Sequence, residues 1–454
     1  MSDKIVVTDI NNRNFTLNPT QIIVFGFAAV TLVGALLLSM PFSSAAGEYT
    51  SFLNALFTST SAVCVTGLVV VDTGTYWSTI GQIIILTLIQ VGGLGFMTMA
   101  TFFFLLLGRK IGLKTRMVMQ ASYNQDSLQG IVNLGKHVLI FTFATELFFA
   151  LLLAIRWSFE LGFPKALWYG LFHSISGFNN AGFDLFGGFK SLTGFVNDPL
   201  VTFSITSLII LGGIGFGVVM EIINYVRYGT RLSTHAKLVL STSAILIVAG
   251  TILIFLFEYN NSLRNLSGFG KFLASYFQSV SPRTAGYNTL DIVSLKSYTQ
   301  FLIIILMFIG ASPGSTGGGL KTTTFATLGA SILSMSRGET EAKVFRRTIP
   351  NQQVARSMAI LIMSLSLVLV VSTALMITEQ GQDFLTLLFE TVSAFGTVGL
   401  TMGLTPHLSP AGKTLIAMTM FLGRLGTLTM VLAFAQRSNL PARIKYPQGN
   451  IMVG

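Results

Sequence analysis

The sequence predicts an all-α integral membrane protein with eight transmembrane helices. These helices are expected in four tandem units around a pseudo-fourfold axis. Each unit consists of a helix, a short pore-type helix, a glycine-containing loop and a second helix. Three observations predict this fold class: the composition of the 454-residue chain, its long apolar runs, and a short motif that occurs four times.

The composition excludes a water-soluble protein. Hydrophobic residues make up 52% of the chain and charged residues only 10%, whereas soluble domains carry about 25% charged residues. The single cysteine, Cys64, excludes a disulfide framework, and the scattered histidines argue against a zinc site. We interpret the formal charge of +11 as basic cytoplasmic loops of a membrane protein, not as a nucleic-acid-binding surface.

Apolar runs of membrane-spanning length occur in pairs. A helix needs about 20 apolar residues to cross a bilayer. The first run and the small residues that follow it resemble a signal peptide. The run is longer than the roughly 7–15 apolar residues of secretory signals, however, so we interpret it as a retained helix. The runs that qualify are 22–42, 82–107, 137–157, 200–223, 236–258, 300–333, 354–377 and 414–435.

A repeated motif lies between the two runs of each pair. It reads Phe-x-(Ser/Thr)-x-Ser, and a glycine follows its last serine by five or six residues. These glycines are separated by 115, 104 and 113 residues, which indicates an internal repeat. We therefore divide the chain into unit 1 (1–110), unit 2 (111–228), unit 3 (229–338) and unit 4 (339–454). The motifs begin at Phe57, Phe172, Phe277 and Phe389, and the glycines are Gly67, Gly182, Gly286 and Gly399.

A second glycine feature lies 24 to 30 residues further on, inside each later run. Small residues allow transmembrane helices to approach one another closely. In units 1, 2 and 4 we therefore interpret these glycines as packing sites within helices that continue through them. The strings are Gly92-Gly93-Leu94-Gly95, Gly212-Gly213-Ile214-Gly215 and Gly423-Arg424-Leu425-Gly426.

The distribution of basic residues predicts the orientation in the membrane. Of the 28 Lys and Arg residues, 18 lie in the termini and in the loops between units, and seven lie in the segments inside the units. Basic loops face the cytoplasm. Both termini are therefore expected in the cytoplasm and the glycine loops outside, although four basic residues in 259–299 weaken the bias there.

The glycine segments are too short to cross the membrane twice as helices, so we expect them to re-enter from the outer face. Non-helical backbone at membrane depth is tolerated only where it is buried in protein or lines water. Four such loops can aim backbone carbonyls at a dehydrated cation, and glycine permits the close approach this needs. Close helix packing is the alternative for any single glycine, but the fourfold repetition favours a ring of carbonyls.

These residues resemble the Trk/Ktr/HKT superfamily of potassium transporters, and most closely the membrane subunit of a bacterial Ktr system. The resemblance extends over nearly the whole chain. It implies channel-like potassium uptake through one pore per chain, with K+ held by filter carbonyls. The filter strings are shorter than the Thr-Val-Gly-Tyr-Gly of potassium channels. The candidate filter residues are Val65, Thr66, Gly67, Asn180, Ala181, Gly182, Thr284, Ala285, Gly286, Thr397, Val398 and Gly399.

The resemblance also implies partners and a location. It implies a homodimer of pore subunits in the bacterial cell membrane, controlled by a separate cytoplasmic ring of nucleotide-binding subunits, with Na+ as an activator. No covalent cofactor is expected. The sequence contains no intact ATP-binding loop, so the expected driving force is the membrane potential, worth about 2.3 kcal/mol per charge per 100 mV.

The second run of unit 3 is interrupted by a polar, glycine-rich string. One proline and five glycines disfavour helix strongly, and apolar residues flank the string on both sides. We therefore expect a loop at membrane depth that acts as a gate below the filter; a simple kink is the alternative. The resemblance implies the same, since the family has an intramembrane loop that restricts ion passage. The string is Gly310, Ala311, Ser312, Pro313, Gly314, Ser315, Thr316, Gly317, Gly318 and Gly319.

Two basic residues are candidate gate residues. Arg424 lies inside an apolar run, where an unpaired arginine costs at least about 2.5–3.5 kcal/mol. We expect it to face the pore inside the filter, to contact the gate loop through carbonyls or hydroxyls, and to oppose free cation flow. Lys321 follows the loop directly; its ammonium either extends to the cytoplasm or takes part in gating.

Four acidic residues lie near these features. Glu146 and Glu221 are within apolar runs, and we interpret them as helix-pairing or near-interface residues in preference to ion ligands. Asp72 and Asp184 follow filter strings. They either concentrate cations at the mouth or are ordinary loop residues.

Two other kinds of protein are alternatives to a channel-like transporter. A secondary transporter that moves another small solute or cation by alternating access also uses repeats and broken helices, but its repeats usually number two. A membrane-embedded enzyme would need a nucleophile with its base, or a metal cluster, and the sequence contains neither arrangement. We therefore expect a transporter and not an enzyme.

Overall fold

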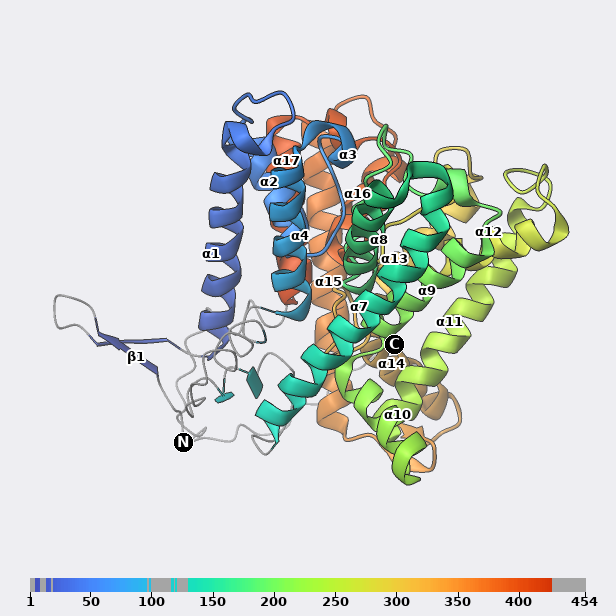
Figure 1. Cartoon of the computed structure of the whole chain (residues 1–454). Helices are drawn as coiled ribbons and strands as arrows, with labels where there is room; N and C mark the ends of the chain where they lie inside the picture. Colours follow the sequence, from blue (N-terminus) through green and yellow to red (C-terminus); the bar gives the residue numbers. More distant parts are fainter. Residues whose placement is uncertain are drawn as a thin grey trace.

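The fold is almost entirely helical (Figure 1). The computed structural model describes residues 5–8, 14–17, 19–95, 98, 116–117, 119–120 and 130–426. A helix satisfies its own backbone hydrogen bonds, which lipid cannot do, so long apolar runs fold as helices. Within the described ranges, four helices are long and apolar enough to cross a membrane: α1 (Pro19–Ser39), α7 (Ile131–Leu161), α11 (Thr234–Glu258) and α15 (Asn351–Thr378).

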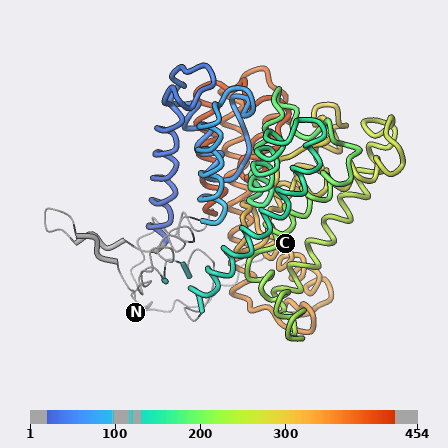
Figure 2. The backbone as a smooth tube through the Cα atoms, in the orientation of Figure 1, coloured from blue at the N-terminus to red at the C-terminus, as the bar shows by residue number. Residues whose placement is uncertain are grey.

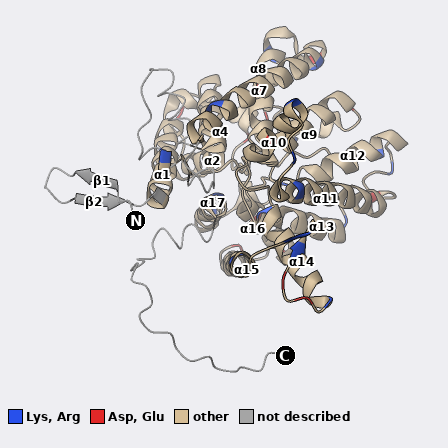
Figure 3. Ribbon diagram, turned by 90° about the horizontal axis from the view of Figure 1, so that it is seen from below, with Lys and Arg blue, Asp and Glu red and all other residues tan. Residues whose placement is uncertain are grey.

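The outer faces of these helices are apolar. Leu36, Ile155, Ile252 and Leu369 are each about half or more exposed, which in a water-soluble protein would be an unusually large apolar surface. Seen from below, most of the ribbon carries neither basic nor acidic residues (Figure 3). The structure therefore agrees with a multi-pass membrane protein.

The second run of each pair forms shorter helices. Serine or aspartate side chains cap three of them: Ser78 accepts from Gly81 N, Ser409 accepts from Gly412 N, and Asp198 accepts from Leu200 N and Val201 N. Such caps satisfy backbone N–H groups that the first helical turn leaves open. The helices are α4 (Thr79–Leu94), α9 (Pro199–Gly213), α13 (Ser297–Phe308) and α17 (Pro410–Leu425).

Three of these helices end at the second glycine feature, which corrects the expectation that they continue through it. Gly95, Gly215 and Gly426 have φ angles of 80°, 102° and 84°, a conformation that glycine adopts readily but a helix does not contain. The run 200–223 is therefore two helices, α9 and α10 (Phe216–Tyr228), bent by 103°. The ends of the runs 82–107 and 414–435 lie outside the described residues.

Four short apolar helices lie between the paired runs, as the sequence predicts. Each packs against the helix before it, in the pairs α1 with α2, α7 with α8, α11 with α12 and α15 with α16. Ser59, Ser174 and Ser279, in the middle of the repeated motif, donate hydrogen bonds to carbonyls of α1, α7 and α11 at 2.7, 2.6 and 2.8 Å. The helices are α2 (Phe52–Val63), α8 (Phe163–Phe178), α12 (Gly268–Val280) and α16 (Phe384–Gly396).

The short helices also pack against helices from neighbouring parts of the chain, and these contacts form a closed circle. The later helix of each pair contacts the next short helix: α4 contacts α8, α9 contacts α12, α13 contacts α16, and α17 contacts α2. The last contact brings the C-terminal helices beside the N-terminal ones, as the red and blue segments of Figure 2 show. The helices therefore surround a common centre.

The remaining described elements are short or peripheral. Two antiparallel hairpins pair Ile5 with Leu17 and Val344 with Arg347. In the second hairpin, Phe345 and Arg346 have φ of 48° and 61°, as a two-residue turn of this kind requires. The elements are β1 (Ile5–Thr8), β2 (Asn14–Leu17), η1 (Pro41–Ser43), α3 (Thr73–Tyr76), η2 (Thr193–Phe195), α14 (Thr322–Ser336), β3 (Lys343–Val344), β4 (Arg347–Thr348) and η3 (Thr405–His407).

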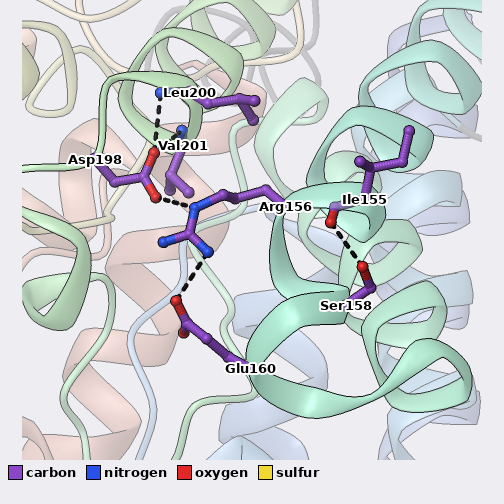
Figure 4. A network of polar contacts seen from close by, with 7 residues as sticks. All are labelled: Ile155, Arg156, Ser158, Glu160, Asp198, Leu200 and Val201. Carbon is purple, nitrogen blue, oxygen red and sulfur yellow. Dashed lines mark hydrogen bonds and ion pairs between the residues drawn. The ribbon is translucent and has the colours of Figure 1, made fainter.

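An ionic network joins the end of α7 to the start of α9 (Figure 4). Arg156 Nε donates to Asp198 Oδ2 at 2.5 Å, and its Nη1 lies 2.8 Å from Glu160 Oε1. The other oxygen of Asp198 accepts from Leu200 N at 3.0 Å and Val201 N at 3.1 Å. Asp198 therefore serves both as a helix cap and as an ion-pair partner.

We expect Asp198→Ala to lower the stability of the protein by about 1–2 kcal/mol, because it removes the cap of α9 and leaves Arg156 with one partner. Thermal unfolding of the purified protein in detergent measures the effect. Glu160→Ala is the matched control, since it removes only an exposed i,i+4 pair worth about 0.3–0.5 kcal/mol. Equal losses from the two variants would contradict the capping role.

Candidate functional site

Four loops follow the short helices, and all adopt the same unusual backbone. In each loop a non-glycine residue in the left-handed region is followed two residues later by a left-handed glycine. Left-handed backbone costs a non-glycine residue about 1–2 kcal/mol, and such strain is found mainly at functional sites. The φ angles are 51° at Val65, 57° at Asn180, 78° at Thr284 and 50° at Thr397, then 91° at Gly67, 69° at Gly182, 78° at Gly286 and 94° at Gly399.

The structure brings the four predicted loop glycines together in a closed ring. A Cβ atom added to Gly182 would lie 2.6 Å from the carbonyl oxygen of Ala285 and 3.1 Å from the Cα of Gly286. A Cβ on any of the other three glycines would likewise overlap a carbonyl oxygen of the neighbouring loop. The overlaps are Gly67 with Ala181, Gly286 with Val398, and Gly399 with Thr66. Each glycine is thus required both by its φ angle and by its neighbour.

The last serine of the repeated motif holds each loop. The carbonyl oxygens of these serines accept from the N–H groups of Thr66, Ala181, Ala285 and Val398 at 2.8–2.9 Å. Each serine side chain makes a second hydrogen bond, as an acceptor in two loops and as a donor in the other two. Ser61 Oγ and Ser393 Oγ accept from Gly67 N at 3.0 Å and Gly399 N at 3.1 Å, whereas Ser176 and Ser281 donate to the carbonyls of Phe183 and Tyr287. The last serine of the motif therefore fixes the backbone conformation of each loop through hydrogen bonds.

The glycine-rich string 310–319 is a loop between α13 and α14, as predicted, and it lies against the ring. Gly318 N donates to Thr397 Oγ1 at 3.0 Å, and a Cβ on Gly317 would overlap Thr284 Oγ1. On its other side the loop contacts the end of α9, because Ser312 N donates to Gly213 O at 3.0 Å. Ala311, Ser312 and Thr316 are buried.

Arg424 connects this loop to α4. Its guanidinium donates to Thr316 O of the loop, to Gly92 O at 2.5 Å and to Gly93 O at 3.1 Å. The predicted contact between Arg424 and a carbonyl of the loop is therefore confirmed. Among the residues that the structure describes, no carboxylate lies within ion-pair distance of this side chain, so backbone carbonyls stabilise the charge.

Lys321 folds back onto the loop. Its Nζ donates to Gly317 O at 2.6 Å and lies 3.5 Å from Gly318 O. In the structure the ammonium therefore contacts the loop carbonyls, in contrast to the alternative that it extends to the cytoplasm. Two cationic side chains thus contact the carbonyls of one loop.

The acidic residues have structural contacts. Asp72 caps α3 and also accepts from Phe189 N at 2.9 Å, and Asp184 accepts from Phe186 N at 3.1 Å. Glu221 accepts from Ser233 N at 2.9 Å beside the start of α11. Glu146 accepts from two buried amides, Gln90 and Asn179.

Sequence reasoning missed the residue that braces the fourth loop. Glu390 accepts from Met402 N at 3.2 Å, from Thr405 Oγ1 at 2.7 Å and from Thr401 Oγ1. A signal was present, since the position after the motif phenylalanine is polar in all four motifs. These residues, Thr58, His173, Gln278 and Glu390, are each at most 1% exposed.

The comparisons with known proteins decide the family. The sequence model of the family described as "TrkH: Cation transport protein" matches residues 8–442. The chain belongs to the TrkH family. It is therefore a transporter and not an enzyme, and its TrkH-family membership agrees with the multi-pass helical fold.

Relatives of this TrkH-family chain are similar over nearly its whole length. It is 44% identical to Ktr system potassium uptake protein B of Bacillus subtilis, over 96% of this chain and 97% of the relative. It is 40% identical to potassium/sodium uptake protein NtpJ of Enterococcus hirae, over 96% and 98%. The crystal structure of the potassium transporter TrkH from Vibrio parahaemolyticus has the same fold, with a TM-score of 0.72 at 18% identity, covering 92% of this chain and 84% of that one.

Proposed function

We propose that this chain is the ion-conducting membrane subunit of a Ktr-type system and carries K+ into a bacterial cell. The observation that carries the proposal is the closed ring in which Gly67, Gly182, Gly286 and Gly399 each contact the backbone of the neighbouring loop. The similarity to Ktr system potassium uptake protein B supports the choice of K+ as the ion.

The proposed architecture has four tandem units, 1–110, 111–228, 229–338 and 339–454, around a pseudo-fourfold axis. The closed order of helix contacts supports it, since the same type of contact joins each unit to the next and the last to the first. In this arrangement α4, α9 with α10, α13 with α14, and α17 are the second crossings of the units, which makes eight. The broken helices are tolerated because the freed backbone groups are buried in protein.

The proposed filter consists of three residues from each loop, from Val65 to Gly67 in unit 1 and at the equivalent positions in the others. Backbone carbonyls can replace the water around a dehydrated cation. The short helices end at these loops, and helix C-termini carry partial negative charge. Both features favour a cation over an anion, and the absence of side chains at the ring glycines leaves room for close approach.

The proposed gate consists of loop 310–319 with Lys321 and Arg424. The loop contacts the filter side chains Thr284 and Thr397, so it covers the filter on one side. Two positive charges beside it oppose the entry of a cation. Opening then requires the loop to leave Thr397 and Arg424 to release the Thr316 carbonyl.

The proposed setting follows from family resemblance and charge. Both termini face the cytoplasm, two copies form a homodimer, and a cytoplasmic nucleotide-binding ring controls the gate. The membrane potential draws K+ inward at about 2.3 kcal/mol per charge per 100 mV, and Na+ is an activator.

Flux measurements on the purified full-length chain in lipid vesicles test the proposal. An inside-negative potential should drive accumulation of a radioactive K+ analogue such as Rb+, and excess K+ should compete more strongly than excess Na+. Stronger competition by Na+ would change the assigned ion from K+ to Na+. This outcome is worth testing because one relative is a potassium/sodium uptake protein. No potential-driven flux of either ion would refute the proposed function.

A further inference from the structure

Three polar side chains from different helices form a buried cluster beside the start of the second loop. Glu146 on α7, Gln90 on α4 and Asn179 at the end of α8 are 3%, 8% and 0% exposed. Gln90 Nε2 donates to Glu146 Oε2 at 3.2 Å, and Asn179 Nδ2 donates to Glu146 Oε1 at 3.1 Å and to Gln90 Oε1 at 2.8 Å. Within the described part of the chain, Glu146 has no ion-pair partner.

Glu146 is one of three acceptors that orient the Asn179 amide; the others are Gln90 Oε1 and Ile175 O. An ionised carboxylate only accepts hydrogen bonds, whereas a primary amide can present either its oxygen or its nitrogen. Both amides direct their NH2 groups to Glu146, and Asn179 Nδ2 also donates to Ile175 O at 2.9 Å. The oxygen Oδ1 of Asn179 is consequently turned away, and it has no hydrogen-bond partner among the described residues.

That oxygen lies against Gly93. A Cβ added to Gly93 would overlap Asn179 Oδ1, so the end of α4 is seated on the Asn179 side chain. The carbonyls of Gly92 and Gly93 accept from Arg424 Nη2 at 2.5 and 3.1 Å. A continuous set of contacts thus runs from Glu146 through Asn179 and α4 to Arg424.

We propose that Glu146 is a positioning residue for the gate. It orients Asn179, which sets where the last turn of α4 lies, and this places the two carbonyls that hold Arg424 against the loop carbonyl of Thr316. The inference rests on the proposed function, because it assigns Glu146 a role in the gate that the proposed function includes. Outside α7, the hydrogen bonds of Glu146 are to Gln90, Ser174 and Asn179, none of which belongs to loop 310–319.

A purely structural role would be helix pairing alone, in which Glu146 joins α4 to α7 without influence on Arg424. The two roles differ in their coupling to Arg424. Contacting networks give non-additive effects, and independent sites give additive ones. They also differ in the effect of placing the carboxylate at position 90 instead of 146. Gln90 Oε1 already accepts from Asn179, so a glutamate at position 90 can still hold Asn179.

The test measures Rb+ leak in vesicles that contain the full chain without any regulatory subunit. We expect Glu146→Gln to raise the leak about three- to thirtyfold, because an amide at this position also presents a donor, which disturbs the hydrogen bond from Asn179 Nδ2 and so the seat of α4. Adding Gln90→Glu should restore the leak to within about twofold of wild type, since the carboxylate returns to the cluster. In an Arg424→Ala background, Glu146→Gln should change the leak less than about twofold.

Glu221→Gln is the matched control and should leave the leak unchanged, as it replaces a glutamate outside the cluster. Thermal unfolding and K+ over Na+ preference are measured for every variant, so that a misfolded protein is recognised. A wild-type leak in folded Glu146→Gln, or equal effects of Glu146→Gln with and without Arg424, would refute the positioning role while the proposed function stands. A wild-type protein that conducts no cation would refute both.

Discussion

Gly286→Ser is expected to reduce the preference for K+ over Na+ by at least about tenfold, which corresponds to about 1.4 kcal/mol. Gly286 has a φ of 78°, which costs a residue with a side chain about 1–2 kcal/mol. A Cβ at this position would also overlap the carbonyl oxygen of Val398, so this oxygen must move. Because the ring is closed, displacement of one carbonyl changes the spacing that a dehydrated ion meets. Competition of K+ and Na+ for Rb+ uptake in a transport-deficient bacterial strain measures the effect.

Gly329→Ser controls for the substitution itself. Gly329 lies in α14, and a Cβ there would meet no atom within 4 Å. The variant should therefore keep the wild-type preference. Retained K+ affinity and selectivity in Gly286→Ser, with normal amounts of protein in the membrane, would contradict the assignment of this loop to the filter.

Shortening the loop by removing residues 311–317 is expected to raise cation leak at least about tenfold when no regulatory subunit is present. The deleted stretch includes Thr316, whose carbonyl Arg424 holds, and Gly317, which lies against Thr284. Its loss removes the contact with Thr284 and one of the three carbonyls that Arg424 holds. A tenfold rise in leak corresponds to a barrier lowered by about 1.4 kcal/mol. Rb+ leak from vesicles under a fixed potential measures the change.

Arg424→Ala provides a milder test of the same gate, because it keeps the loop and removes only the donor to Thr316, Gly92 and Gly93. It should also raise the leak, by less than the deletion does. Arg156→Ala is the matched control, since the ion-pair partners of Arg156 are Glu160 and Asp198 and not the loop. A leak that stays at the wild-type level in both gate variants would remove the gate assignment.

Much of the site was predictable because the chain repeats it. The motif that begins at Phe57, Phe172, Phe277 and Phe389 locates the four short helices, and its last serine predicts where each loop starts. The string 310–319 was recognisable as a loop because proline and glycine disfavour helix whatever surrounds them. Arg424 could be singled out because a charge in an apolar run needs a partner.

Other features had no local signal. Gly92, Gly212 and Gly423 do pack against the ends of α2, α8 and α16, as expected, but the glycine three positions later in each string ends the helix. Packing and helix termination both call for glycine, so the sequence pattern alone could not separate them. At Gly215 the next N–H, that of Phe216, donates to Gly314 O of the loop, a partner about a hundred residues away.

By itself the sequence determined that this is a membrane protein, where its long helices lie, and that one loop-forming motif occurs four times, because composition and spacing along the chain are local properties. Only the tertiary structure decided that the four glycines meet, that Lys321 turns back onto the loop, and that Glu146 contacts Gln90 and Asn179. These contacts join residues distant in sequence, and a buried polar side chain takes whichever partner the packing of helices brings within hydrogen-bonding distance.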